Sequence, residues 1–94
     1  MRYLILTYYR KASGQIDEAM TVSKNLKLRD NQTANVILDF KEQKVLRCMV
    51  EGMNGIKDWD TVVSYYYPHY THIIERLFNE NGHAVSIKLN TVDQ

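Results

Sequence analysis

The first third of the chain carries the two-residue alternation of a β-hairpin. A run rich in β-branched and aromatic residues over 3–9 is followed by a turn signal at 11–14, and alternation over 16–24 predicts the returning strand. The run over 3–9 is apolar on both of its faces, which is typical of a strand buried in the middle of a sheet. The pattern therefore predicts a hairpin whose first strand is central.

A second hairpin is predicted after a polar segment. Residues 25–33 are mostly polar and indicate a connection, after which alternation over 36–40 and 45–50 predicts two strands joined by a turn at 42–43. That turn contains no glycine, whereas residues 51–55 contain two. The glycine pair is a strong loop signal and ends the run of strands.

From Asp58 onward the apolar period changes to that of a helix. Apolar residues fall on one face over 59–78, and Asp58 or Asp60 is expected to cap the helix. Pro68 lies inside this segment and lacks a backbone N–H, so a kink or a restart of the helix is expected near it. Alternation resumes over 84–89 and predicts a last strand.

These elements define a mainly β fold with one helical segment, in the order ββββαβ. The length of 94 residues fits a single domain over 1–94. The wide apolar face of the helix has to be buried, so we expect a small five-stranded antiparallel barrel or half-open sheet with the helix packed on it. A domain this small buries a limited share of its surface, which favours association with further subunits.

Composition excludes several classes of protein. Hydrophobic residues make up 45% and charged residues 24% of the chain, which is a globular composition. The single cysteine excludes an internal disulfide framework. The start of the chain lacks the apolar region of a secretory signal, and no stretch approaches the length of about 18 apolar residues that a membrane helix needs. A cytoplasmic location, in whatever cell makes the protein, and no membrane partner are therefore expected.

The net charge of +1 conceals an asymmetry between two parts of the chain. Residues 1–57 contain ten Lys/Arg and six Asp/Glu, whereas residues 58–94 contain two Lys/Arg and five Asp/Glu. A basic part of this kind suits an anionic partner, although solvated lysines on exposed strands give the same count.

No group of residues indicates catalysis or a bound cofactor. His69, His72 and Glu75 are spaced along one helical row, but two histidines without a further anchored ligand are weak support for a metal site, and no metal is predicted. Cys48 lies in a predicted strand without neighbours that would lower its pKa, so buried packing is expected. Without a phosphate-binding loop or a serine elbow, neither an enzyme nor a small-molecule substrate is predicted.

Aromatic and cationic residues supply the candidate nucleic-acid contacts. Seven tyrosines are present, and a ring beside a cation suits base stacking and phosphate contact, although packing in the core or between subunits explains tyrosines equally. The polar connection offers amide and cationic groups, unless it is only a solvated turn. The candidate contacts at the end of the first strand and in the connection are Tyr8, Arg10, Lys11, Asn25, Lys27, Arg29 and Asn31.

Three stretches of the chain also resemble a known family. They are YLILTYYRKASGQIDEAM, NVILDFKEQKVLRC and DWDTVVSYYYPHYTHIIERLFNENGH, and they are similar to small proteins from cyanophages and ocean metagenomes. The resemblance covers nearly the whole chain and implies an Sm-like fold, a strongly bent five-stranded barrel whose members form rings and bind RNA. The chain departs from the Sm pattern because it lacks the Asp/Asn-centred first motif and the Arg-Gly dipeptide of the second, and because its helix comes late.

Together, these observations and the resemblance predict an oligomeric ring that binds single-stranded RNA or DNA. By analogy with such rings we expect about five to seven subunits. The residues 25–31 occupy the place, between the second and third strands, where Sm-like proteins carry an RNA-contacting loop. The alternative is an accessory factor that acts on a host protein and does not bind nucleic acid.

Overall fold

The computed structural model of the chain describes residues 1–87 and contains one open antiparallel sheet. Its strands are β1 (Tyr3–Arg10), β2 (Ile16–Ser23), β3 (Val36–Asp39) and β4 (Lys44–Cys48), and they lie in the order β2-β1-β3-β4. Both predicted hairpins are confirmed, and β1 lies between β2 and β3 as its two apolar faces indicated.

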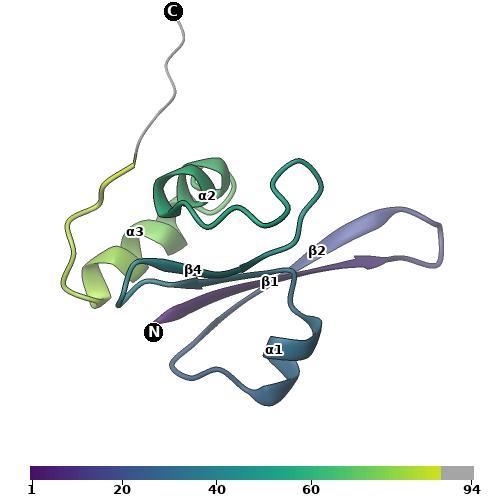
Figure 1. Cartoon of the computed structure of the whole chain (residues 1–94), viewed down its shortest axis with the longest axis horizontal. Coiled ribbons are helices and arrows are strands. Elements are labelled where there is room, and N and C mark those ends of the chain that lie inside the picture. The colour runs from purple at the N-terminus through teal and green to yellow at the C-terminus, as the bar shows by residue number, and fades with distance from the viewer. Residues whose placement is uncertain (88–94) are drawn as a thin grey trace, which may run out of the picture.

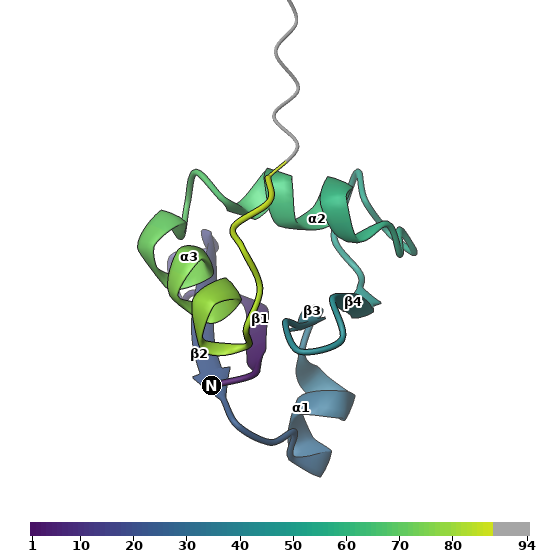
Figure 2. The ribbon, with the colours of Figure 1, turned by 90° about the vertical axis from the view of Figure 1, so that its left-hand side faces the viewer.

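Helices cover both sides of the sheet, to different extents. The helices α2 (Trp59–Tyr66) and α3 (Thr71–Glu80) lie on one side, and the short helix α1 (Leu28–Thr33) lies on the other (Figures 1 and 2). We call these sides the helical face and the α1 face of the sheet.

The main core lies between the sheet and the helical face. Alternate residues of a strand point to the same side, so β1 and β3 each present a row of aliphatic side chains to α2 and α3. Phe40 contacts Trp59 and Phe78 edge to face, with ring centroids 4.9 and 5.3 Å apart. The fully buried members of this core include Leu4, Leu6, Val36, Leu38, Val62, Val63, Tyr66, Ile74 and Phe78.

A smaller apolar cluster lies on the α1 face. Ile5, Ile37 and Ala34 are buried there, and Tyr3 and Leu26 pack against them. The connection between the hairpins is thereby anchored to the sheet by the residues that flank α1.

The five-stranded barrel of the sequence prediction is wrong. The described chain forms a four-stranded open sheet with three helices, in the order ββαββαα. Residues 84–87 of the predicted last strand form no strand, with Val85 39% exposed, and residues 88 and 89 lie outside the described part. The apolar face that a barrel would turn inward is covered here by α2 and α3, so this face is buried without closure of the sheet.

The single predicted helix is two helices separated by a turn. A helix end at Tyr66 and a new start at Thr71 place Pro68 in the turn between them, where its missing N–H costs no helical hydrogen bond. The break near Pro68 is thus confirmed, and the proline precedes the new helix. Asp58 caps α2, since its Oδ2 accepts a hydrogen bond from the backbone N–H of Thr61 at 3.0 Å.

Candidate nucleic-acid interface

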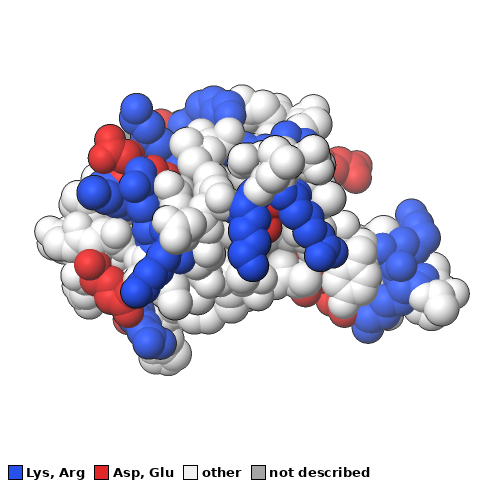
Figure 3. Space-filling model, turned by 90° about the horizontal axis from the view of Figure 1, so that it is seen from below, with Lys and Arg blue, Asp and Glu red and all other residues white. Residues whose placement is uncertain are grey.

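The segment that forms the helices α2 and α3 and the segment that forms the sheet and α1 carry net charges of opposite sign. The segment 58–87, which forms the helical face, contains one Lys/Arg and four Asp/Glu, whereas the segment 1–57 contains ten and six. Figure 3 views the molecule from the α1 side and shows Lys and Arg side chains spread over this surface, with smaller groups of Asp and Glu among them, mostly toward its edges. The α1 face therefore produces a positive potential that attracts anions.

The strand register identifies which basic residues of the sheet contribute to this surface. Ile37 lies opposite both Ile5 and Arg47, and residues that lie opposite each other share a face. Because Ile5 and Ile37 belong to the cluster on the α1 face, Arg47 also belongs to that face. Lys44 lies opposite Asp39, the next α1-face residue of β3. The strand β4 thus adds two cations to those of α1.

Several of these cations have no acidic partner. Lys11 is paired with Asp17, with Nζ and Oδ2 3.2 Å apart. Within residues 1–87, by contrast, the side chains of Arg29 and Lys44 form neither an ion pair nor a hydrogen bond. Uncompensated charge is therefore present on α1 and β4, where an anionic ligand would meet it.

One ion pair on this side of the sheet is structural. Arg2 binds the carboxylate of Asp39 with two hydrogen bonds, from Nε at 2.8 Å and from Nη2 at 2.7 Å. Burial of Asp39 opposes its ionisation, but Arg2 and the backbone N–H groups of Glu42 and Lys41 outweigh it, so the pKa of the carboxyl lies below its usual value. Arg2 is therefore engaged in holding the end of β3.

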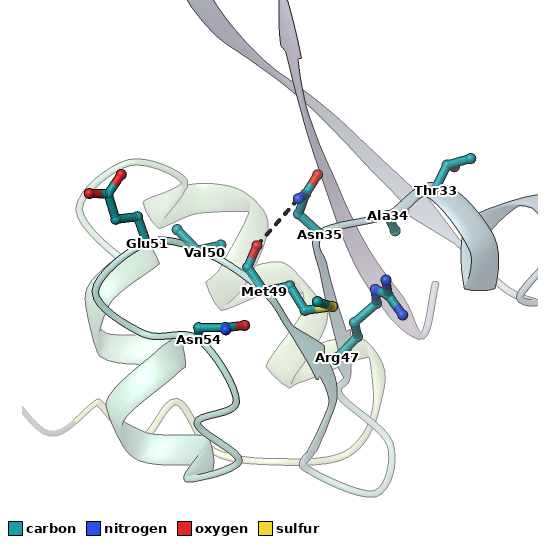
Figure 4. A pocket seen from close by; sticks show the side chains of 8 residues that line it. All are labelled: Thr33, Ala34, Asn35, Arg47, Met49, Val50, Glu51 and Asn54. Atoms are coloured by element: carbon teal, nitrogen blue, oxygen red, sulfur yellow. Dashed lines mark hydrogen bonds between the residues drawn. The ribbon is translucent and has the colours of Figure 1, made fainter.

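An open pocket of about 360 Å³ lies beside the unpaired cations of the α1 face, between the end of α1 and the loop after β4. It is lined by Thr33, Ala34, Asn35, Arg47, Met49, Val50, Glu51 and Asn54 (Figure 4).

Within the pocket, Arg47 has a buried donor without a partner. Its Nε is buried and has no hydrogen-bond partner among the described residues. The Asn35 amide is occupied, since its Oδ1 accepts from the backbone N–H of Tyr8 at 2.9 Å and its Nδ2 donates to the Met49 carbonyl at 3.3 Å. A buried, unsatisfied guanidinium N–H calls for an acceptor, and a phosphate or carboxylate suits it best.

The rest of the pocket suits an uncharged, flat group. Met49 reaches toward Arg47, and Asn54 lies on the neighbouring loop (Figure 4). A thioether adapts to irregular apolar shapes, and a carboxamide can pair with a base edge. Glu51 lies at the far end of the pocket, so an anion would be favoured only at the Arg47 end.

Tyr8 lies on the helical face, away from this pocket. Its hydroxyl is 2.8 Å from the hydroxyl of Tyr66, a residue that is 1% exposed. Burial raises the pKa of both phenols, that of Tyr66 to about 12. The next residue, Tyr9, points to the α1 face, where its side chain is 46% exposed. Tyr9 lies an even number of residues after Ile5 on the same strand, so the sequence alone could have assigned it to this face.

Arg10 and Lys11 lie at the tip of a projecting ribbon. The strand β1 pairs with β3 only as far as Leu6, so the rest of the β1–β2 hairpin extends beyond the sheet (Figure 1). The Arg10 guanidinium donates to the Gly14 carbonyl at 2.6 Å and thereby holds the turn. Figure 1 shows the ribbon tip and α1 well apart, so the two predicted groups of contacts form separate patches.

The four candidates of the connection are all exposed on or beside α1. Asn25 precedes the helix, Lys27 occupies its N-cap position, and Arg29 and Asn31 lie within it. Positions four apart on a helix share one side, so Lys27 and Asn31 lie together and Arg29 points elsewhere. The helix stands where the sequence predicted a polar connection, and it presents these side chains on a fixed frame.

Other kinds of site have little support within residues 1–87. No group of three or more His, Cys, Asp or Glu side chains lies close enough there to hold a metal ion, and Glu75 accepts a hydrogen bond from Tyr67 at 2.5 Å. Cys48 is buried as predicted, and burial raises the pKa of its thiol. None of the described helices has the length and the unbroken apolar sequence that crossing a bilayer requires.

No protein family model, curated protein or solved structure matches this chain. The resemblance to the cyanophage family stays a prediction.

Proposed function

We propose that this protein binds single-stranded nucleic acid, RNA or DNA, on the α1 face of its sheet. The observation that carries the proposal is the segregation of charge: the helical face is acidic, and the α1 face displays cations without acidic partners. Proteins that bind single strands without sequence preference combine a positive surface that follows the backbone with aromatic rings on which bases stack.

The described residues offer both kinds of contact. Arg29, Lys44 and Arg47 supply cations to the phosphates, and the exposed ring of Tyr9 supplies a stacking surface. The pocket beside Arg47 is large enough for one flat base together with its phosphate, which would satisfy the buried Nε. Because phosphate contacts dominate this mode of binding, the protein would show little preference for sequence, and its affinity would depend strongly on salt concentration.

Fluorescence anisotropy with labelled oligo-U and oligo-A tests the proposal. We expect the R29A/R47Q double variant to lose affinity for both oligonucleotides alike and to lower the salt slope by about 1 to 2 units, since each phosphate contact contributes about 0.7. The matched control is Arg76→Ala, which removes a cation from the 78% exposed site on α3. This control should bind like the wild type.

Two results would contradict the proposal. One is the absence of binding by the wild-type protein at low salt, and the other is an equal loss in R76A and in the double variant. Either would favour the accessory factor that acts on a host protein, for which a pulldown from host lysate is the direct assay. The barrel from which the ring of about five to seven subunits was inferred is not present, so the ring is not part of this proposal.

A further inference from the structure

The strand β2 is an edge strand of unusual openness. It pairs with β1 along its full length, from Ile16 to Ser23, in unbroken register and without a proline or a bulge. Edge strands of this length and regularity offer a row of unused backbone groups to another strand, and most proteins blunt them.

Only at one end of this edge does the chain itself bind an outward-pointing backbone group. The Asp17 carboxylate accepts the backbone N–H of Glu18 at 2.8 Å, which shows that this N–H points away from β1. Backbone groups alternate in direction along a strand, so those of Met20 and Val22 point outward as well. Among residues 1–87 they have no hydrogen-bond partner.

The opposite edge, β4, is protected. The Leu46 carbonyl accepts from Lys57 Nζ at 2.9 Å, and the Cys48 carbonyl accepts from the backbone N–H of Gly55 at 2.8 Å. The register of β4 is also shifted by an irregularity. A head-to-tail contact of β2 with β4 would have to displace these bonds, whereas a contact of β2 with another β2 displaces none.

We propose that a second copy of this chain docks antiparallel along β2, with the two-fold axis at Thr21 and perpendicular to the sheet. In this register Met20 of each copy exchanges backbone hydrogen bonds with Val22 of the other, so the open groups are satisfied.

Charge complementarity selects this register. Lys24 directly follows β2, so with the axis at Thr21 it comes close to Glu18 of the other copy, whose carboxylate also accepts a hydrogen bond from the Tyr70 hydroxyl, and opposite charges across an antiparallel pair are stabilising. Moving the axis by one residue to Met20 places Glu18 opposite Val22 and loses both charge pairs. The occupant of the edge is therefore a copy of the same strand.

The dimer goes beyond the proposed function but affects it. A two-fold axis perpendicular to the sheet keeps the α1 faces of both copies on the same side, so two four-stranded sheets become one and their basic surfaces join. One strand of nucleic acid could then contact both copies, and each contact would raise the effective concentration of the next. Dimerisation itself requires no nucleic acid, so the two proposals can fail separately.

Cross-linking at single introduced cysteines tests the register. Thr21 and Ala19 are both exposed on β2, so neither substitution disturbs the core. In the proposed dimer the two copies of residue 21 form a non-hydrogen-bonded pair with Cα atoms about 4.5 Å apart, within disulfide range. The two copies of residue 19 would be four residues apart, about 13 Å, and out of reach. The native Cys48 is buried and serves as an internal control.

We expect T21C to form a covalent dimer under mild oxidation and A19C to remain monomeric on a non-reducing gel. Light scattering of the wild-type protein, free of nucleic acid, should give twice the chain mass of 11.1 kDa at micromolar concentration. Lys24→Glu places like charges opposite each other and should weaken the dimer several-fold. A monomeric wild type, or equal cross-linking of the two cysteine variants, would overturn the proposal.

Discussion

The hydrogen bond between Tyr8 and Tyr66 gives the sharpest test of how the β1–β2 ribbon is attached to the helices. Each hydroxyl can be removed without change of ring shape by substitution with phenylalanine. The two hydroxyls differ in exposure: Tyr66 is 1% exposed, whereas Tyr8 is only partly buried. The two substitutions therefore leave different groups behind.

The magnitudes follow from what each substitution leaves without a partner. Tyr8→Phe leaves the buried Tyr66 hydroxyl without a partner. It should lower the free energy of unfolding by about 1.5 to 2 kcal/mol, since an unsatisfied buried donor or acceptor costs about 1–3 kcal/mol. Tyr66→Phe leaves the partly buried Tyr8 hydroxyl with the Glu18 carboxylate as its partner and should cost about 0.5 to 1 kcal/mol. The double variant should be no less stable than Y8F, because replacing both partners is nearly neutral.

Urea denaturation of the four proteins measures these differences as a double-mutant cycle. For a domain of this size, 1 kcal/mol corresponds to about 4–8 °C in Tm, so thermal melts provide a second readout. Additive losses in the double variant, or a larger loss in Y66F than in Y8F, would refute the reasoning. Y8F should also bind oligonucleotides like the wild type, because Tyr8 lies on the helical face.

Two further predictions concern stability. Leu77→Ala removes a 2% exposed side chain from the core and should cost about 2–5 kcal/mol, as a urea titration would reveal; a loss within error would contradict its place in the core. The pKa of Asp39 is lower in the folded state, so its contribution is complete above the unfolded value of about 3.9 and is lost as pH falls through the folded pKa. Acid titration of unfolding should show this decline in the wild type, and Asp39→Asn should flatten it.

The elements that could be predicted from the sequence are those with a buried face. The hairpin β1–β2 and the helices α2 and α3 carry the apolar period of their structures, and Pro68 marks the break between the helices. The helix α1 has no buried residue, so no apolar stripe reveals it, and its flanking Leu26 and Ala34 make the contacts with the sheet. The barrel failed because closure depends on long-range packing that local alternation does not encode.

The place of Arg47 in the site was harder to predict, because the register shift in β4 changes the side of the sheet to which this residue points. Simple alternation would place Arg47 on the same side as Val45, which is in the core. The register shift in β4 lets both Val45 and Cys48 point into the core and turns Arg47 to the α1 face. Tyr8, by contrast, has the parity of Leu4 and Leu6, so its inward direction could have been predicted from the strand pattern.

The most direct test of the central claim is to map the bound strand on the protein by NMR. Backbone amide shifts would be followed while unlabelled oligo-U is added at low salt, and the titration would be repeated at high salt. We expect the largest shifts on α1, around Arg47 and at Tyr9, with α2 and α3 nearly unchanged and all shifts reduced by salt. Shifts concentrated on the helical face, or none on the α1 face, would contradict the account.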